Sequence, residues 1–523
     1  MLFIVLAVAV VMSGLMFDVK LHTGGDDSTY ALQALNFVRD GLIPVGFKSP
    51  GYPMFLGIFV LFDGLNIILL KFSSVVLYLG TIAGFYAVFR DKLDAVVLDV
   101  TLLLMAMNFV TLELSHHLYS EMLYTVVQIG ALYYFWKAEG EQWSLKSILF
   151  LALAGMVGFY VRSLGGTFPL AVALWLILQR NWKALAWFGA SSALFYLPLK
   201  LTEFAYGVTV VGQAPQILMV SPYNPSLGNE TFSGIVLRFI NNVVVYVQYL
   251  FPKSLGLPSW DHLGATEVSF LPDGKAFVSV LLSLVVIIGL VRMFRQKSSL
   301  IPFAAFYTAV YILFLCFSLQ NVFTTARYLI PVVPFLIVSF VVGMEVLIHR
   351  VLRTQLNKTP GFKRLFVLGT FALIVSNAAV ASKAVNENLP ILKANIKGEE
   401  FAGYSVDWIN YLKACRWIGQ NLQRDSVSVI CRKPELFQIY TQGYLTHGVY
   451  QIESTNPDTI IANWKRWKMT HLLYDNFQWT GTLRRYIQPV AEKYPALFVL
   501  LHKEGIDAPS LIYRLQYAAI PSR

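Results

Sequence analysis

The stretch that decides the fold is Gly24-Gly25-Asp26-Asp27-Ser28-Thr29-Tyr30, which comes soon after a first apolar segment, residues 2–17. A second polar element follows, Lys48-Ser49-Pro50-Gly51-Tyr52-Pro53, and the chain then becomes apolar again. Holding a carboxylate pair between two membrane segments costs free energy, so such a pair indicates a functional site. The sequence therefore predicts that the rest of the chain places these acids against a negatively charged, lipid-borne substrate.

The composition is that of a polytopic membrane protein. Of 523 residues, 56% are hydrophobic and only 14% are charged, whereas soluble proteins carry about 25% charged residues. The net charge of +11 comes mostly from loops between apolar segments, which favours anionic lipid headgroups rather than nucleic acid as partners. Cys316 lies in an apolar segment, while Cys415 and Cys431 lie in the polar tail and could pair in an oxidising compartment.

The apolar segments predict about eleven transmembrane helices. Some are shorter than the roughly 20 residues that cross a bilayer, so we expect flanking residues to extend them. The first is predicted to be a retained helix, because it has no basic start and no small-residue cleavage site. The segments are 2–17, 65–89, 95–112, 118–137, 146–161, 165–179, 184–201, 275–294, 299–318, 329–349 and 364–384.

Three further stretches are predicted to lie at the membrane surface. Residues 53–62 are apolar but too short to span, which favours a re-entrant or juxtamembrane helix. Residues 29–40 place their apolar side chains on one helical face. Residues 235–251 are apolar but carry four interrupting polar residues, which favours an interfacial helix over a span. These stretches belong to two outer loops, residues 18–64 and 202–274.

The basic residues orient the chain. With the N-terminus in the cytoplasm, most Lys and Arg of the short loops fall on the cytoplasmic side, as the positive-inside rule requires. An odd number of spans then places the tail outside. The sequence thus predicts a membrane domain, residues 1–384, and a soluble extracytoplasmic domain, residues 385–523.

The tail is predicted to be an α/β domain, because it mixes one helical pattern with short β-like runs. Its length is sufficient for a core of its own. The helical pattern covers residues 408–422, and the β-like runs cover residues 427–431, 471–474, 497–501 and 511–515.

Charged residues gather at the predicted outer ends of the helices. Taken singly, each has an ordinary explanation: an arginine at a helix end often reaches toward headgroups, and a surface histidine is often merely solvated. Acids and bases that converge on one side of the membrane instead predict a reaction site. The set comprises Asp26, Asp27, Lys48, His116, His117, Glu121, Arg162 and Arg327.

One reaction uses all of these groups. A carboxylate near the membrane surface can deprotonate a hydroxyl, and cations beside it can stabilise a departing phosphate. Because phosphate leaves readily, no general acid is required, so the set suits glycosyl transfer from a polyprenyl-phosphate sugar with inversion at the anomeric carbon. Alternatively, Asp26 and Asp27 divide the roles, one acting as base and the other holding a divalent cation such as Mg²⁺ or Mn²⁺ on the donor phosphate.

The two polar elements also resemble the first outer loop of the GT-C superfamily of integral-membrane glycosyltransferases. The resemblance is greatest to the branch that contains the protein O-mannosyltransferases and the aminoarabinose transferases of lipid A. It implies the GT-C fold and assigns the catalytic acid to Asp26, although many bacterial members match Asp27 instead. Lys48 matches the phosphate-contacting lysine, in Lys-Ser-Pro rather than the family's Lys-Pro-Pro.

Later stretches match the same family. Ser120-Glu121-Met122-Leu123-Tyr124 resembles the acidic start of the fourth helix, Arg162 an arginine after the fifth, and Ala326-Arg327-Tyr328 the start of an Arg-Tyr…Pro…Pro element. The resemblance implies a bacterial inner-membrane enzyme with a periplasmic active site and a glycan, lipid or protein acceptor. It implies donor phosphate contacts from Lys48, Arg162, Arg327 and Tyr328, and a substrate pocket from Tyr30, Tyr52, His116, His117 and Glu121.

Two other classes of membrane protein remain open. A transporter for lipid-linked glycans would carry charges near the bilayer midplane and an internal repeat, and this sequence shows neither. A glycan polymerase or ligase of the O-antigen type would also carry arginines and histidines in its outer loops. It usually lacks both the acidic first loop and the soluble C-terminal domain. The sequence therefore favours the glycosyltransferase.

Overall fold

The chain divides into two compact units. The structure, a computed structural model, describes residues 1–41, 43–44, 48–207, 214–221, 227–257, 274–320, 323–352, 360–441, 443, 445–448 and 455–520. The membrane unit comprises Met1–Asp18 and Ala34–Leu392, and the C-terminal unit comprises Val19–Gln33 and Lys393–Arg523. The first loop is therefore divided between the units, although the sequence analysis grouped it with residues 1–384.

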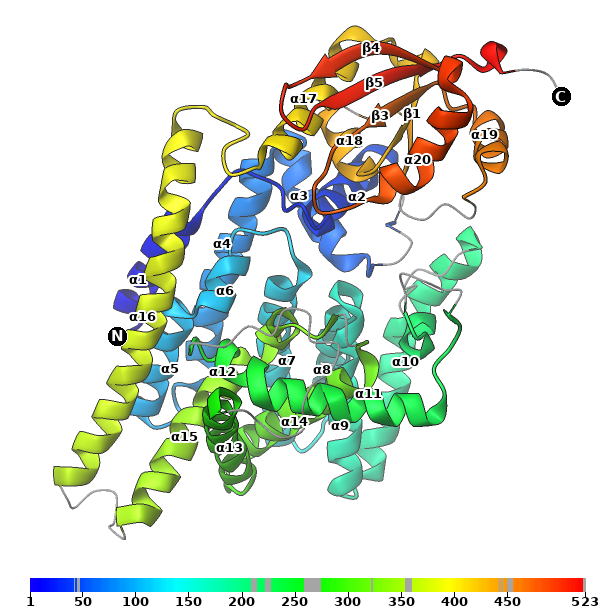
Figure 1. Cartoon of the computed structure of the whole chain (residues 1–523). Coiled ribbons are helices and arrows are strands. Elements are labelled where there is room, and N and C mark those ends of the chain that lie inside the picture. The colour runs from blue at the N-terminus through cyan, green and yellow to red at the C-terminus, as the bar shows by residue number, and fades with distance from the viewer. Residues whose placement is uncertain are drawn as a thin grey trace. The chain divides into compact units, whose positions relative to one another are not determined.

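The membrane unit is built from helices (Figure 1). Side-chain caps begin several of them, as where the Asn66 carboxamide accepts a hydrogen bond from the Leu69 N–H. The helices are α1 (Leu2–Met16), α2 (Asp26–Asp40, shared between the units), α3 (Gly51–Asp63), α4 (Ile67–Phe89), α5 (Ala95–Met107), α6 (Phe109–Leu114), α7 (Ser120–Gly140), α8 (Leu145–Val161), α9 (Thr167–Leu178), α10 (Trp182–Tyr206), α11 (Phe232–Val245), α12 (Phe251–Ser254), α13 (Gly274–Phe294), α14 (Leu300–Ser318), α15 (Val333–Leu352) and α16 (Pro360–Ile396).

These helices confirm the predicted class, a polytopic helical membrane protein. In the described part of the chain, seven helical stretches are long and apolar enough to cross a bilayer. Shorter apolar helices accompany them: α1, α3, α5, α8, and a stretch that joins the 3₁₀ turn η1 (Ser163–Gly166) to α9. Each predicted apolar segment contains a helix. Residues 95–112 hold two, α5 and α6, because the chain leaves helical geometry at Asn108.

The π-helix η4 (Tyr246–Leu250) joins α11 to α12 in one continuous helical stretch. This stretch is long and apolar enough to cross a bilayer. Its contacts explain the polar residues that favoured an interfacial helix. The Asn242 amide donates to the carbonyls of Cys316 (2.9 Å) and Leu319 (2.8 Å) at the C-terminal end of α14. Figure 1 shows α11 crossing the direction of α10. Helix α11 thus supplies donors to the end of α14, where the last carbonyls of a helix have no partner within it. The position of this stretch at the membrane surface stays a prediction.

Helix α16 returns the chain to its beginning. Its Asn388 amide donates to the carbonyls of Leu15 (3.0 Å) and Phe17 (3.1 Å), so the end of α1 lies beside α16. The helix continues to Ile396, well past residue 384, where the last apolar segment was expected to end. This part contains Pro390 and several asparagines, which are poor helix formers, so tertiary contacts such as those of Asn388 help to hold it helical.

The C-terminal unit holds a five-stranded sheet of order β2-β1-β3-β5-β4. Strands β1 (Ser428–Cys431), β2 (Leu445–Gly448) and β3 (His471–Tyr474) are parallel neighbours, while β4 (Phe498–Glu504) and β5 (Ser510–Leu515) join as antiparallel strands. Four of these strands match the predicted β-like runs, and helix α17 (Val406–Asn421) matches the predicted helical stretch. The tail is therefore α/β, as expected.

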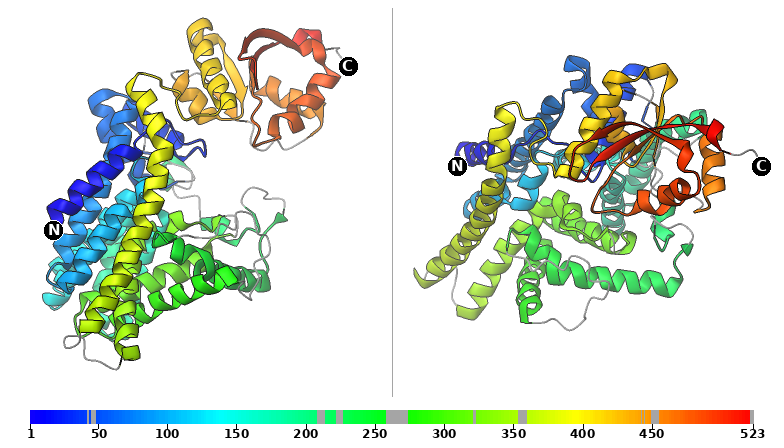
Figure 2. Two further views of the ribbon diagram at one scale, coloured as in Figure 1. Left: turned by 60° about the vertical axis from the view of Figure 1, so that its left-hand side comes forward. Right: turned by 45° about the horizontal axis from the view of Figure 1, so that its top comes forward.

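Helices cover both faces of this sheet, as Figure 2 shows. On one face, Ile430 and Leu472 pack with α19 (Pro457–Arg466) and α20 (Thr482–Lys493) around Trp464. The other face, which carries Val429 and Cys431, is covered by α17 and α18 (Pro434–Tyr440). The three cysteines of the chain are buried and free.

Candidate active site

A buried glutamate between two arginines forms the centre of the membrane unit's site. Glu121 is fully buried, and its Oε1 lies 2.8 Å from Arg162 Nη1. The Arg327 guanidinium pairs with both carboxylate oxygens of Glu121, and its Nη2 lies 3.4 Å from Oε2. With two cations to one anion, the group carries a formal charge of +1. A positive, partly desolvated cluster of this kind can bind a phosphate.

Helix ends position these three side chains. Glu121 stands in the first turn of α7, where the helix dipole favours a negative charge. Arg162 is the C-cap of α8, and its guanidinium also donates to Ser120 Oγ (3.1 Å). Arg327 lies in the 3₁₀ stretch η6 (Ala326–Val332) before α15. The sequence predicted these residues to be site residues, and the structure brings them together.

Aromatic rings extend the cluster on two sides. The Arg327 guanidinium lies 3.7 Å from the centre of the Tyr119 ring, and the Arg162 guanidinium lies 5.1 Å from the centre of the Tyr328 ring. The His117 ring stacks on Tyr119 at 5.3 Å, and the His116 ring follows at 4.6 Å. The two histidines are thus linked to the arginines through Tyr119, which the sequence analysis did not single out.

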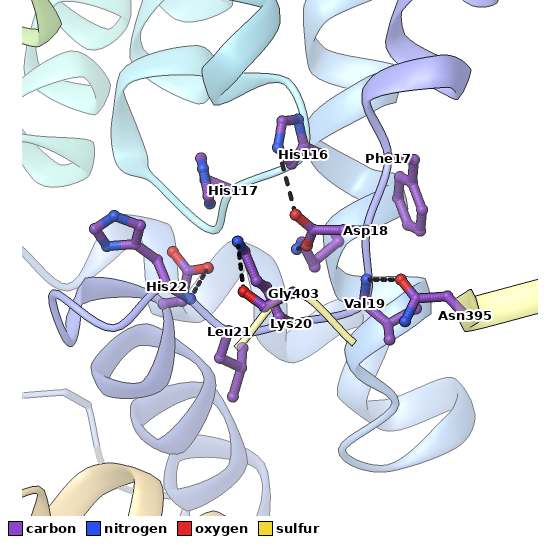
Figure 3. A network of polar contacts seen from close by, with 12 residues as sticks. Phe17, Asp18, Val19, Lys20, Leu21, His22, His116, His117, Asn395 and Gly403 are labelled. Carbon is purple, nitrogen blue, oxygen red and sulfur yellow. Dashed lines mark hydrogen bonds and ion pairs between the residues drawn. The ribbon is translucent and has the colours of Figure 1, made fainter. Parts of the chain in front are cut away.

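A second buried ion pair lies beyond the histidines. Lys71 of α4 is fully buried, and its Nζ lies 2.5 Å from Asp18 Oδ1, while His116 Nε2 lies 3.9 Å from Asp18 Oδ2. Figure 3 shows Asp18 facing His116. Neither member of this pair was predicted from the sequence. Lys71 is a charge inside an apolar segment, and that pattern is itself a signal of function.

An apolar cavity of about 490 Å³ lies in the membrane unit among α3, α7, α8 and α10. Two of its residues are close to the cluster in sequence: Leu123 lies two residues after Glu121, and Val161 directly precedes Arg162. A cavity with this lining suits a hydrocarbon chain. It is lined by Gly51, Met54, Phe55, Leu123, Val127, Leu153, Met156, Val157, Tyr160, Val161, Phe195 and Pro198.

The acid pair begins α2, in the C-terminal unit. Gly25 adopts a positive φ of 97°, which turns the chain into the helix. Its carbonyl accepts hydrogen bonds from the hydroxyls of Ser28 (3.0 Å) and Thr29 (2.7 Å). Asp27 is fully buried, and its Oδ2 accepts a hydrogen bond from the His22 N–H (3.0 Å). Asp26 is half-buried, so the two acids have different environments.

The remaining predicted residues occupy separate places. Tyr30 is buried in the C-terminal unit, and Tyr52 is fully buried in α3 of the membrane unit. Lys48 is half-buried shortly before α3. Their roles stay predictions.

A divalent cation at the acid pair finds few suitable ligands. Among the residues that the structure describes, no group of three or more His, Cys, Asp or Glu side chains is placed to hold a metal. One carboxylate of the pair, Asp27, already accepts the His22 N–H, and the other, Asp26, interacts electrostatically with the Lys433 ammonium. This donor set fits a cation poorly.

Comparison with known proteins identifies the fold. No family model and no curated protein sequence matches the chain. Among solved structures, it is similar to ArnT from Cupriavidus metallidurans bound to undecaprenyl phosphate, with a TM-score of 0.61 at 13% identity. The apo state of the same protein gives 0.58 at 14%. Each comparison covers 100% of this chain and 99% of the other. The chain therefore has the fold of the GT-C glycosyltransferases, in the form represented by ArnT.

Proposed function

We propose that this protein is a glycosyltransferase that moves a sugar from a polyprenyl phosphate to an acceptor hydroxyl at the outer face of a bacterial inner membrane. The observation that carries the proposal is the cluster of Glu121, Arg162 and Arg327, whose neighbours along α7 and α8 line an apolar cavity. A polyprenyl phosphate suits both features, because its anionic head can bind the arginines and its hydrocarbon tail can fill the apolar cavity. The likeness to a protein solved with undecaprenyl phosphate supports the same ligand class.

In this mechanism the arginines hold the donor phosphate and stabilise its charge as the glycosidic bond breaks. The Glu121 carboxylate aligns both guanidinium groups and leaves one unit of positive charge for the phosphate. Lys48 and Tyr328 add donor contacts, while His116, His117, Tyr30 and Tyr52 shape the pockets for sugar and acceptor. A single displacement then inverts the anomeric carbon, because no enzyme nucleophile intervenes.

The base is Asp26 rather than Asp27. Asp27 is fully buried and accepts a backbone N–H, which suits a side chain that fixes the turn. Asp26 is half-buried and therefore accessible to an acceptor hydroxyl. A general base of this kind contributes about 10²–10⁴-fold to the rate.

We expect Asp26→Asn to lower kcat by about 10²–10⁴-fold, since the amide cannot take the acceptor's proton. Asp27→Asn should mainly lower thermal stability, with a smaller effect on kcat. The assay is transfer from a synthetic polyprenyl-phosphate sugar by the purified protein. Asp40→Asn, at the exposed end of the same helix, is the matched control. Full activity in both Asp26→Asn and Asp27→Asn would show that neither is the base.

We expect chelation to leave the transfer rate unchanged, because the described residues supply no third His, Cys, Asp or Glu ligand at the acid pair and Asp26 is within electrostatic reach of the Lys433 ammonium. The measurement compares initial rates of salt-washed membranes with and without a chelator. Loss of activity that Mg²⁺ or Mn²⁺ restores would instead assign a cation to the acid pair.

Two other functions predict different results in the same assay. A transporter would move the lipid-linked sugar without forming a new glycosidic bond. A polymerase or ligase would require a diphosphate-linked donor, so its product would appear only with that substrate.

A further inference from the structure

The loop that carries the acids is held by residues from the far end of the chain. Within the C-terminal unit, the Val19 N–H donates to Asn395 Oδ1 (3.2 Å), a contact drawn in Figure 3. The Tyr404 hydroxyl accepts from the Leu21 N–H (2.8 Å) and donates to the Leu21 carbonyl (2.9 Å). These contacts fix the backbone just before the turn that begins α2.

One contact reaches the turn itself. The Lys433 Nζ donates to the carbonyl of Thr23 (2.8 Å), and it lies 3.9 Å from the point where a Cβ on Gly25 would stand. Lys433 is only 6% exposed. Burying an ammonium costs free energy unless its donors find partners, so this placement calls for a specific role.

The surroundings of Lys433 hold its side chain in place. Its Nζ lies 5.6 Å from the centre of the Trp408 ring and 5.0 Å from that of Trp479. Its own backbone carbonyl accepts a hydrogen bond from the Tyr411 hydroxyl (3.0 Å). The ammonium thus lies next to two neighbouring rings and donates one hydrogen bond to the loop.

The charges around Lys433 include the proposed base. Burial, with Arg432 beside it, lowers the Lys433 pKa to about 8, and the opposing influences come from Glu435, Asp26 and Asp475. The attraction between Lys433 and Asp26 is mutual, so the ammonium also favours the carboxylate form of Asp26.

We infer that Lys433 is a positioning residue for the transfer reaction: its ammonium holds the Thr23–Gly25 turn and keeps a positive charge beside Asp26. This inference rests on the proposed function, in which Asp26 is the base. It gives a residue of the C-terminal unit a role in the transfer reaction, through Asp26 of the same unit.

The pH dependence of kcat separates this role from a purely structural one. The working form of Lys433 is protonated, so activity in the wild-type protein should fall as the pH rises through about 8. Arginine stays protonated to pH 12 and above. In Lys433→Arg, the fall on the alkaline side should therefore move up by more than one pH unit.

Removing the charge of Lys433 tests the same inference through the acidic limb of the pH profile of kcat. In Lys433→Met, we expect kcat at pH 7 to fall at least tenfold, and the acidic limb of the profile to move to higher pH. The KM for the donor should change less than twofold, because the donor phosphate is held by the arginines. Lys413→Met, an exposed lysine of α17, is the matched control and should match wild type.

A second titrating group faces the same ammonium, so it requires its own control. Burial raises the pKa of Asp475 to about 7. Asp475→Asn should leave the alkaline limb at its wild-type position if that limb belongs to Lys433. An alkaline limb that moves in Asp475→Asn and stays in Lys433→Arg would overturn the assignment.

The remaining outcomes distinguish this inference from the proposed function. If Asp26→Asn is inactive but both Lys433 variants keep the wild-type profile, the positioning role is wrong and the function stands. If Lys433→Met lowers activity without moving either limb, Lys433 is merely structural and the inference fails. If Asp26→Asn transfers sugar at the full rate, the base assignment and the positioning role both fail, while the transferase activity stands. If the wild-type protein transfers no sugar from a polyprenyl phosphate, the proposed function itself fails. Should Lys433→Met not fold, the profile of Lys433→Arg decides alone.

Discussion

At the scale of single residues, the site is defined by how charges are shared. Glu121 balances one of the two positive charges of Arg162 and Arg327, and it does so from a fully buried position. A buried carboxylate between two guanidiniums fixes their orientation, while the surplus charge remains for a ligand. In the proposed function the three residues therefore have separate roles. The arginines bind the donor phosphate, and the glutamate holds the arginines in their orientation.

This division of roles between the arginines and the glutamate can be tested with one variant of each kind. Arg327→Met should weaken binding of polyprenyl phosphate and lower kcat/KM by about 10²–10³-fold. Glu121→Gln should keep phosphate affinity, because both cations remain, but should destabilise the fold by about 3–5 kcal/mol, because the buried Arg162 and the half-buried Arg327 lose their charged partner. Calorimetric binding and thermal unfolding in detergent measure the two effects. Equal losses of affinity in both variants would contradict the division.

At the scale of elements, the apolar cavity depends on a close approach of two helices. A Cβ at Gly51, the first residue of α3, would lie 2.7 Å from the carbonyl oxygen of Tyr160 in α8. Backbone atoms cannot rotate away as a side chain can, so a larger residue would force the helices apart. Gly51 and Tyr160 both line the cavity, which links this packing to the proposed lipid site.

We therefore expect Gly51→Ala to destabilise the protein by about 1–3 kcal/mol and to raise the KM for the lipid donor. Gly130→Ala in α7 is the matched control, since nothing lies within 4 Å of its Cβ position. That change should stay within about 0.5 kcal/mol of wild type. The measurements are thermal unfolding in detergent and initial transfer rates. Identical behaviour of the two variants would show that the helix contact can relax.

Apolar periodicity predicted the elements well. Each long apolar run became a helix, and β1, β3, β4 and β5 fell on short runs of mainly apolar residues. Strand β2 was missed because Thr446 and Gly448 give no such run. Its position depends on pairing with β1, a long-range contact that local sequence does not encode.

The site was predicted only in part, for a similar reason. Single charges at helix ends indicated Glu121, Arg162 and Arg327, but the sequence did not show that they pair with one another. The sequence also assigned Lys433 no role, because its contact with Thr23 joins residues that are 410 positions apart. Contacts of this kind depend on the folded chain and leave no local pattern.

At the scale of the whole molecule, orientation is the property that the function requires. We expect an alkaline phosphatase fused after the last residue to be active in a bacterial host, because this enzyme matures only outside the cytoplasm. A fusion placed after Arg295, between α13 and α14, should be inactive. Fluorescent-protein fusions at the same positions should show the opposite pattern. A reversed pattern would place the C-terminal unit inside the cell and exclude an outer-face reaction.

The contacts that hold the acidic loop also bear on how the protein is made. Thr23 leaves the ribosome 410 residues before Lys433, a delay of roughly 20–80 s at usual rates of synthesis. Throughout that time the loop has emerged without the residues that fix it. Premature termination between α16 and α18 would therefore yield a chain with its membrane helices but without the contact that holds the turn before α2. The last quarter of the gene completes the first loop.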